Sequence, residues 1–263
     1  MKSNKKIIGV LDMNIDNMYV LNAIRNTFIN DDIYYVNDTE VETFDKMDTS
    51  DISKHVSKHI NYLISKHIDI LVVVSDSIVE YCEELLNQVE LPVINIINET
   101  IEYVNENYEY KNFGFLSTTT MIESNIYQKS FRYNHLYSMN GDKLKFLIRN
   151  QLVKTTETFQ EAKNIIAPVY KKDLDVIIPS LVNFLMVKTE INEFLKDVDI
   201  VDVDEVLVNK IQEVLYKDIE LPKKGKGKTF ICVNQEENDL SQLKRLLKIK
   251  YKVLNILEEE ANN

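Results

Sequence analysis

The sequence predicts an α/β fold with two similar lobes, each a parallel sheet flanked by helices. Short apolar runs alternate with helical patterns along the chain, and this alternation predicts parallel strands joined by crossover helices. Two of the runs repeat one arrangement, in which an Asp precedes an apolar run, at Asp69 and again at Asp175. Six residues past each Asp lie Ser75 and Leu181. The repeat predicts that the two lobes are related in structure.

The predicted strands are apolar or β-branched runs bounded by polar residues, which is the pattern of a strand buried between covering helices. Helical patterns lie between these runs. A Pro and two Gly in residues 221–228 break any helix there, so this lysine-rich segment predicts an exposed basic loop, with an anion site as the alternative. In chain order the eight strand segments are residues 6–11, 33–36, 70–74, 93–96, 113–116, 176–178, 199–203 and 229–233.

The composition predicts a globular, cytoplasmic protein. The 263 residues are 44% apolar, which is enough for a core in each lobe. No stretch approaches the roughly 20 apolar residues of a membrane span, and no signal-peptide core follows the polar start. A net charge of −11 argues against a nucleic-acid partner, because Lys and Arg supply most affinity for phosphates. Cys82 and Cys232 lie on different predicted elements, a helix and a strand, which predicts reduced thiols.

Polar side chains follow the first of the two repeated strands. Ser75, Asp76 and Ser77 come directly after the apolar run at 70–74. Ligands of open α/β sheets gather at the carboxyl ends of parallel strands, so these residues are candidates for ligand contact. They are also typical of helix caps, with Ser75 capping a helix that begins near Ile78 and Asp76 or Ser77 sharing that task. The pattern leaves both interpretations open.

The repeated strands and the N-terminal run 7–13 carry motifs that resemble those of the glutamate racemase family, part of the aspartate/glutamate racemase superfamily. Asp12 matches the Asp of the family's Phe-Asp-Ser-Gly. The family's Cys-Asn-Thr falls on residues 75–77, its Pro-Val-Ile is kept at 92–94, and its Gly-Cys-Thr-His-Tyr-Pro falls on 180–185. The resemblance covers nearly the whole chain, except that residues 131–160 match poorly and leave the family's Ala-Cys-Pro without a place.

This resemblance implies the fold of that superfamily, with residues 1–98 and 209–263 in the first lobe and 99–208 in the second. It also implies a small amino-acid-like ligand in a cleft between the lobes, a homodimer, and no cofactor. The turn after Asp12 lacks the glycines of the family. The ligand-binding positions that the resemblance implies are Asp12, Met13, Asp38, Thr39, Phe44, Ser75, Asp76, Ser77, Thr118, Leu181, Val182 and Asn183.

The positions of both family cysteines hold other residues here. Racemisation without a cofactor needs two groups that exchange protons on opposite faces of Cα, and thiols with an unperturbed pKa of ~8.5 suit this. Ser75 reacts only beside a base, Leu181 cannot ionise, and Asn183 takes the family's histidine position. We therefore expect a pseudoenzyme, a racemase-like protein that has lost racemase activity and serves binding, regulation or assembly.

Two alternatives to that expectation stay open. One is an active glutamate or aspartate racemase, an isomerase that supplies D-glutamate to the cell wall. The other is an enzyme of altered chemistry, such as metal-assisted hydrolysis, that uses Asp12, Ser75 and Asp76.

Carboxylates near the strand ends predict a preference for cationic ligands. Asp12, Asp16 and Asp76 would meet near one crevice, where they could hold an amine or Mg²⁺. The alternative is that Asp16 and Asp76 only begin helices, whose positive dipole ends favour acidic residues. His55 and His59 have the spacing of metal ligands on a helix, but no acidic or Cys partner accompanies them. We interpret them as a solvated helix face and predict no metal site.

Overall fold

The structure is a computed structural model that describes residues 5–13, 17–38, 47–217, 219–233 and 246–257. The chain divides into two compact units, residues 1–96 with 207–263, and residues 97–206. Each unit holds one sheet of parallel strands flanked by helices, which confirms the fold class predicted from the sequence. No helix in the described ranges is long and apolar enough to cross a membrane.

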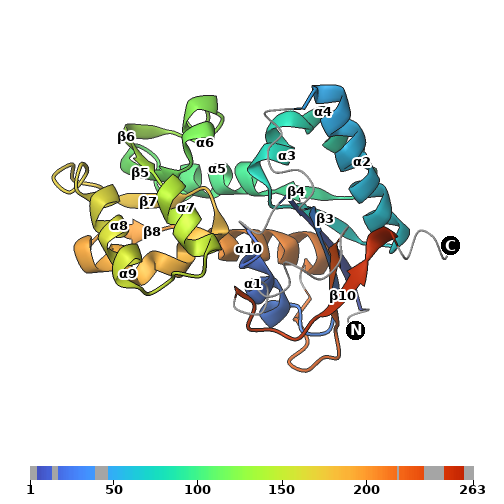
Figure 1. Ribbon diagram of the computed structural model, residues 1–263. Coiled ribbons are helices and arrows are strands. Elements are labelled where there is room, and N and C mark those ends of the chain that lie inside the picture. The colour runs from blue at the N-terminus through green and yellow to red at the C-terminus, as the bar shows by residue number, and fades with distance from the viewer. Residues whose placement is uncertain (1–4, 14–16, 39–46, 218, 234–245, 258–263) are drawn as a thin grey trace. The chain divides into compact units, whose positions relative to one another are not determined.

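The first unit is built on a six-stranded sheet in which every neighbouring pair is parallel (Figure 1). Two of its inner strands, β1 and β3, are apolar along almost their whole length, because helices cover both faces of the sheet. Across the sheet the strands are β10 (Lys252–Asn255), β9 (Thr229–Val233), β2 (Asp32–Asp38), β1 (Ile7–Met13), β3 (Ile70–Val73) and β4 (Val93–Asn95).

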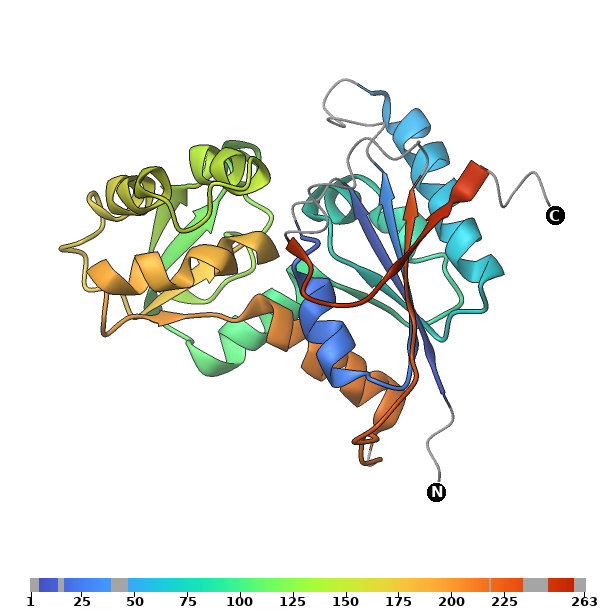
Figure 2. The same ribbon diagram turned by 60° about the horizontal axis from the view of Figure 1, so that its bottom comes forward.

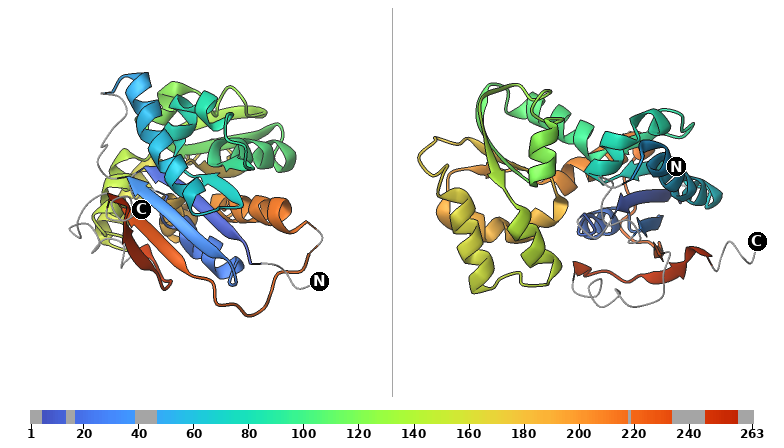
Figure 3. Two further views of the ribbon diagram at one scale, coloured as in Figure 1. Left: turned by 90° about the vertical axis from the view of Figure 1, so that its right-hand side faces the viewer. Right: turned by 45° about the horizontal axis from the view of Figure 1, so that its top comes forward.

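Helices cover the two faces of this sheet. Helix α2 (Thr49–Ser65) lies on one face, whereas α1 (Val20–Thr27) and α10 (Val203–Tyr216) lie on the other (Figures 2 and 3). The remaining helices of this unit are α3 (Asp76–Tyr81) and α4 (Glu83–Leu86), and α5 (Ile96–Asn107) begins at its last residue and belongs to the second unit.

The buried stripe of α2 corrects one prediction. Residues 52, 56, 59, 60 and 63 recur at helical spacing and are all buried. His59 falls on this stripe and is only 4% exposed, and its ring meets that of His55 edge to face at 5.1 Å between centroids. The interpretation of the pair as a solvated helix face is therefore wrong for His59.

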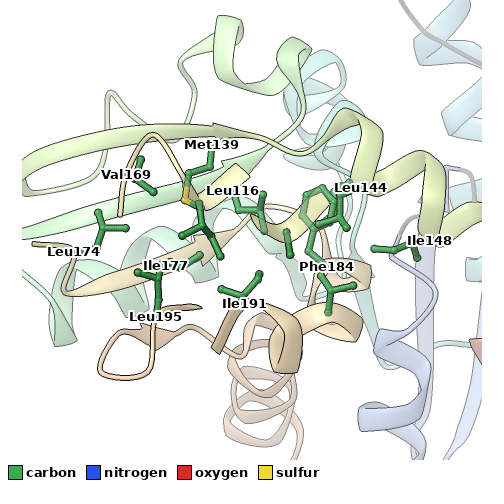
Figure 4. Close-up of a cluster of buried hydrophobic side chains, with 14 residues drawn as sticks. Leu116, Met139, Leu144, Ile148, Val169, Leu174, Ile177, Phe184, Ile191 and Leu195 are labelled. Atoms are coloured by element: carbon green, nitrogen blue, oxygen red, sulfur yellow. The ribbon is translucent and has the colours of Figure 1, made fainter. Parts of the chain in front are cut away.

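The second unit has a four-stranded parallel sheet of the order β6 (Tyr133–Asn140), β5 (Lys111–Ser117), β7 (Val176–Pro179), β8 (Asp199–Ile200). A core of buried side chains fills the space between this sheet and the helices on one of its faces (Figure 4). Gly141 is required there, because a Cβ would overlap the ring of Phe184. The helices are α6 (Thr119–Ser124), α7 (Asp142–Arg149), α8 (Thr156–Ile166), the 3-10 helix η2 (Val182–Val187) and α9 (Lys188–Phe194).

The two sheets repeat one strand order. Four neighbouring strands of the first unit have the order β2-β1-β3-β4, so the first strand in the chain lies between the second and the third. The second unit has the same arrangement in its order β6-β5-β7-β8. The repeated Asp has the same contacts in both. Asp69 Oδ2 accepts from the backbone N–H of Ile7, and Asp175 Oδ2 accepts from that of Asn112, each at 2.8 Å. The Asp that recurs in the sequence therefore fastens the third strand of each sheet to the first.

The strand predictions need two corrections. All eight predicted segments contain a strand, but that at 199–203 ends at Ile200, and Val203 already begins α10. Strands β6 and β10 were missed. Both lie at sheet edges, and most of their side chains are at least partly exposed, so neither has the apolar run that identifies a buried strand.

Candidate functional site

The carboxyl edge of the first sheet contains a topological switch point. The chain leaves β1 towards β2 on one side and later returns to β3 on the other, so the connections diverge from the carboxyl ends of β1 and β3. Such a divergence opens the crevice in which ligands of α/β sheets bind. Asp12 and Met13 end β1, and Ser75 to Ser77 follow β3, so the structure brings these predicted positions to one edge.

Asp12 is a fully buried carboxylate at this edge. Its Oδ2 accepts a hydrogen bond from the hydroxyl of Tyr35 at 2.6 Å, and its Oδ1 accepts one from the backbone N–H of Met13 at 2.8 Å. Tyr35 lies on β2 opposite Val10, two residues before the level of Asp12, so its side chain reaches along the sheet face to the carboxylate. The Tyr35 contact was not predicted, because the register in which two strands pair cannot be read from a single sequence.

Ser75 is the N-cap of α3, as one of the two sequence interpretations proposed. Its Oγ accepts from the backbone N–H of Ile78 at 3.4 Å, which satisfies a donor at the helix start. The helix begins at Asp76, two residues earlier than predicted, and Asp76 is buried in its first turn. Ser75 and Asp76 are thus held by helix geometry at the end of β3.

A third polar residue, Asn37, lies at this edge and was absent from the predicted ligand positions. It pairs directly with Asp12 across the parallel ladder of β1 and β2. Its side chain is 2% exposed, and its Oδ1 has no hydrogen-bond partner among the described residues.

The carboxyl edge of the second sheet is a switch point of the same kind, between β5 and β7. The hydroxyls of Ser117 and Ser180, one at the end of β5 and one just past β7, hydrogen-bond each other at 2.7 Å in the interior. Thr118 caps α6 by accepting from Met121 N–H at 3.4 Å. The other predicted ligand positions of this unit, Leu181, Val182 and Asn183, are buried at the start of η2.

A carboxylate that the sequence did not identify follows β6. Asp142 accepts from the hydroxyl of Thr119 at 2.5 Å and from its backbone N–H at 3.2 Å, and Asn140 Nδ2 contacts the same pair. This exposed group ties the start of α7 to the start of α6.

Both thiols of the chain are buried away from these strand ends. Cys82 follows α3 and is 2% exposed, and burial raises the pKa of its thiol to about 11. Cys232 lies within β9, between Val36 of β2 and Leu254 of β10. Neither cysteine takes part in a disulfide among the described residues.

The remaining predicted positions have less structural context. Asp38 is the last residue of β2 and pairs with Met13, and its side chain is outside the description. Asp16, Thr39 and Phe44 lie outside the described residues. Within the described ranges no group of three or more His, Cys, Asp or Glu is arranged to hold a metal ion.

Comparison with known proteins points to one family. No family model matches the chain. The glutamate racemase of Aquifex aeolicus is 22% identical over 243 residues, which cover 91% of this chain and 93% of that protein. The glutamate racemase of Hydrogenobaculum is 21% identical over 213 residues, or 79% of this chain and 82% of that protein.

Solved structures agree with these sequence matches. A glutamate racemase isoform of Bacillus anthracis superposes with a TM-score of 0.80 at 21% identity, covering 95% of this chain and 97% of that one. The glutamate racemase of Thermus thermophilus, in complex with β-chloro-D-alanine, gives 0.81 at 18% identity, covering 95% and 96%. In sequence and in fold the chain is similar to these glutamate racemases.

The strand ends of the second sheet carry no thiol. The residues at the ends of β5 and β7 are Ser117, Thr118, Ser180 and Leu181, which carry hydroxyl or apolar side chains. The two cysteines of the chain lie elsewhere, in the interior.

Proposed function

We propose that this racemase-like protein no longer racemises amino acids and instead binds a small cationic or amine ligand at the carboxyl edge of the first sheet, in a binding, regulatory or assembly role. The observation that carries this proposal is the buried carboxylate of Asp12, held by Tyr35 at the switch point, with Asp76 at the end of the neighbouring strand. Buried carboxylates favour cations and repel the carboxylates of an acidic amino acid.

The proposed loss of racemisation follows from the residues that take the cysteine positions. Ser75 Oγ accepts from a backbone N–H as a helix cap, and no carboxylate or imidazole in the described part of the chain hydrogen-bonds to it. A serine hydroxyl without an adjacent base is a poor proton acceptor near neutral pH. Leu181 offers no proton at all. An active glutamate or aspartate racemase would need an acid–base group at each of these two positions, and this chain has none at either.

An enzyme of altered chemistry that uses Asp12, Ser75 and Asp76 is the second candidate. The two carboxylates favour it, because hard cations such as Mg²⁺ take oxygen ligands. The capping role of Ser75 argues against its use as a nucleophile. A divalent metal that binds and supports hydrolysis of a phosphate ester would favour this candidate.

Ligand binding tests the proposal directly. We expect the melting temperature to rise with methylammonium, Mg²⁺ or Mn²⁺ but not with D- or L-glutamate or D- or L-aspartate, because a ligand that binds only the native state stabilises it. No response to any cation would remove the cation-binding role.

One substitution tests the part played by Asp76. Asp76→Asn keeps the shape of the side chain but removes its charge, so it should weaken cation binding by about 1.5 to 3 kcal/mol, the range for one charge-assisted contact. The matched control is Asp51→Asn, an exposed carboxylate in the first turn of α2, which should leave binding unchanged. Calorimetry measures both. Equal affinities for the two variants would exclude Asp76 from the site.

We also propose the homodimer that the family resemblance implies. Light scattering coupled to size-exclusion chromatography would give twice the chain mass of 30.8 kDa. A single species at the chain mass would contradict it.

A further inference from the structure

The side-chain oxygen of Asn37 is a buried acceptor without a hydrogen-bond partner among the described residues, at the edge where ligands of this fold type bind. Native proteins satisfy nearly all their buried polar groups, so an orphaned one needs a physical explanation. The described residues contain four buried side-chain atoms of this kind. Of the four, only Asn37 Oδ1 lies at the carboxyl end of a strand. The others belong to Gln128, Glu190 and Thr229.

The strand geometry directs this amide to the same sheet face as the Asp12 carboxylate. Residues paired directly across a ladder project to one face, and so do residues two apart along a strand. Asn37 pairs with Asp12 and follows Tyr35 by two positions, and Tyr35 does reach Asp12 through its hydroxyl. A carbonyl oxygen and a carboxylate therefore lie side by side at the end of β1 and β2.

The same unit satisfies another buried asparagine completely. Asn22 of α1 donates from Nδ2 to the carbonyls of Tyr19 and Leu246, and its Oδ1 accepts from Lys248 N–H at 2.8 Å. Asn22 is thus a structural residue, and its contacts differ in kind from those of Asn37.

We propose that Asn37 is a ligand-contacting residue whose Oδ1 accepts a hydrogen bond from the N–H of a protonated amine held near Asp12. Two adjacent acceptors, one of them negative, match a group with a positive charge and several N–H donors. This inference rests on the proposed cation-binding function and names the amine as its ligand class. In the ligand-free protein Asn37 Oδ1 then stays without a hydrogen bond, and the ligand supplies the missing donor.

Stability of the ligand-free protein gives the first test. Leu is close to Asn in shape and needs no hydrogen bond, so Asn37→Leu should unfold at the same urea concentration as the wild type or a higher one. The matched control Asn22→Leu removes three hydrogen bonds in the same unit and should unfold at a lower concentration. If Asn37→Leu is destabilised as Asn22→Leu is, Asn37 has a structural partner and the inference is overturned.

Binding of methylammonium, with potassium as the cation that has no N–H, gives the second test. The wild type should bind methylammonium in preference to potassium, and Asn37→Leu should bind it about tenfold more weakly, as expected for loss of one hydrogen bond. Equal methylammonium affinity in wild type and variant would overturn the role of Asn37 while leaving the proposed function intact. A wild type that binds Mg²⁺ but not methylammonium would overturn the amine assignment alone, and one that binds no cation would overturn the proposed function as well.

Discussion

At the scale of single residues, the clearest stabilising contact of the first unit surrounds Asp31, at the amino edge of its sheet. Its buried carboxylate accepts from Lys6 N–H at 2.9 Å and from the Tyr216 hydroxyl at 2.6 Å. The ring of Tyr216 stacks on Phe28 with 6.0 Å between centroids. Burial raises the pKa of Asp31 above its ordinary value, and these donors together with Arg25 act in the opposite direction.

We predict that Tyr216→Phe destabilises the protein by about 1.5 to 3 kcal/mol at neutral pH, the range for a hydrogen bond to a charged group. The pKa of Asp31 is raised in the folded state, so its ionisation opposes folding as pH rises from the unfolded pKa to the folded one. Loss of the hydroxyl strengthens that opposition. Urea denaturation should therefore show the largest difference near neutral pH and a smaller one in acid, where Asp31 is protonated.

The control for this prediction is Tyr110→Phe, because the side chain of Tyr110 is 69% exposed. It should change the free energy of unfolding little at any pH. A loss for Tyr216→Phe that is the same in acid and at neutral pH would show that packing, rather than the bond to Asp31, is responsible.

The buried thiol of Cys82 gives a prediction in alkaline solution. Its folded pKa of about 11 lies above the ordinary thiol value of 9.0, so the unfolded chain loses this proton first. The free energy of unfolding then falls between pH 9 and 11 by on the order of 2 kcal/mol through this group. Cys82→Ala should remove that part of the decline in denaturation curves. Parallel pH dependences for variant and wild type would contradict the shift.

At the scale of secondary-structure elements, the structure explains why an Asp precedes an apolar run in both lobes. Asp69 and Asp175 each hold the backbone N–H at the start of the first strand of their sheet, and each lies near a lysine at that strand's start. The lysine contacts are at 3.0 Å for Lys6 and 3.9 Å for Lys111. The repeat in the sequence predicted that the two lobes are related, and the structure adds the backbone N–H that each Asp binds.

Removal of either Asp should weaken the join between the first and third strands of its own sheet. We predict that Asp69→Ala and Asp175→Ala each cost about 1 kcal/mol, the usual net value of one hydrogen bond in a partly exposed place. Hydrogen exchange should show faster exchange at Ile7 in the first variant and at Asn112 in the second. Exchange that increases equally in both units for either variant would contradict this local role.

The elements that the sequence could not predict share a physical cause. Inner strands such as β1 and β3 are covered on both faces, and their sequences are therefore continuous apolar runs. In the edge strand β6 only Met139 of eight residues is buried, so no such run exists. The candidate site likewise contains one contact that a local sequence pattern predicts and others that no local pattern predicts. The cap at Ser75 has a local signature, whereas the contacts of Asp12 with Tyr35 and of Ser117 with Ser180 join strands that are distant in sequence.

At the scale of the whole molecule, the chain has the fold of the glutamate racemases, and the proposed loss of racemisation rests on Ser75 and Leu181, which carry no group suited to proton transfer at Cα. Replacement of both Ser75 and Leu181 by Cys should not restore full racemase activity. Met13, Asp76 and Asn183 would still differ from the residues expected to orient a substrate and tune a thiol pKa. Full recovery in the double variant would show that the cysteines alone account for the loss.

The most direct test is exchange of the α-proton of D- and L-glutamate and D- and L-aspartate in deuterated water, followed by proton NMR with the purified wild-type protein. Two-base racemisation necessarily replaces this proton by solvent deuterium, whatever the equilibrium between the enantiomers. We predict loss of the α-proton signal no faster than in protein-free buffer. Exchange above that background that disappears in Ser75→Ala would contradict the account and identify the protein as an active racemase.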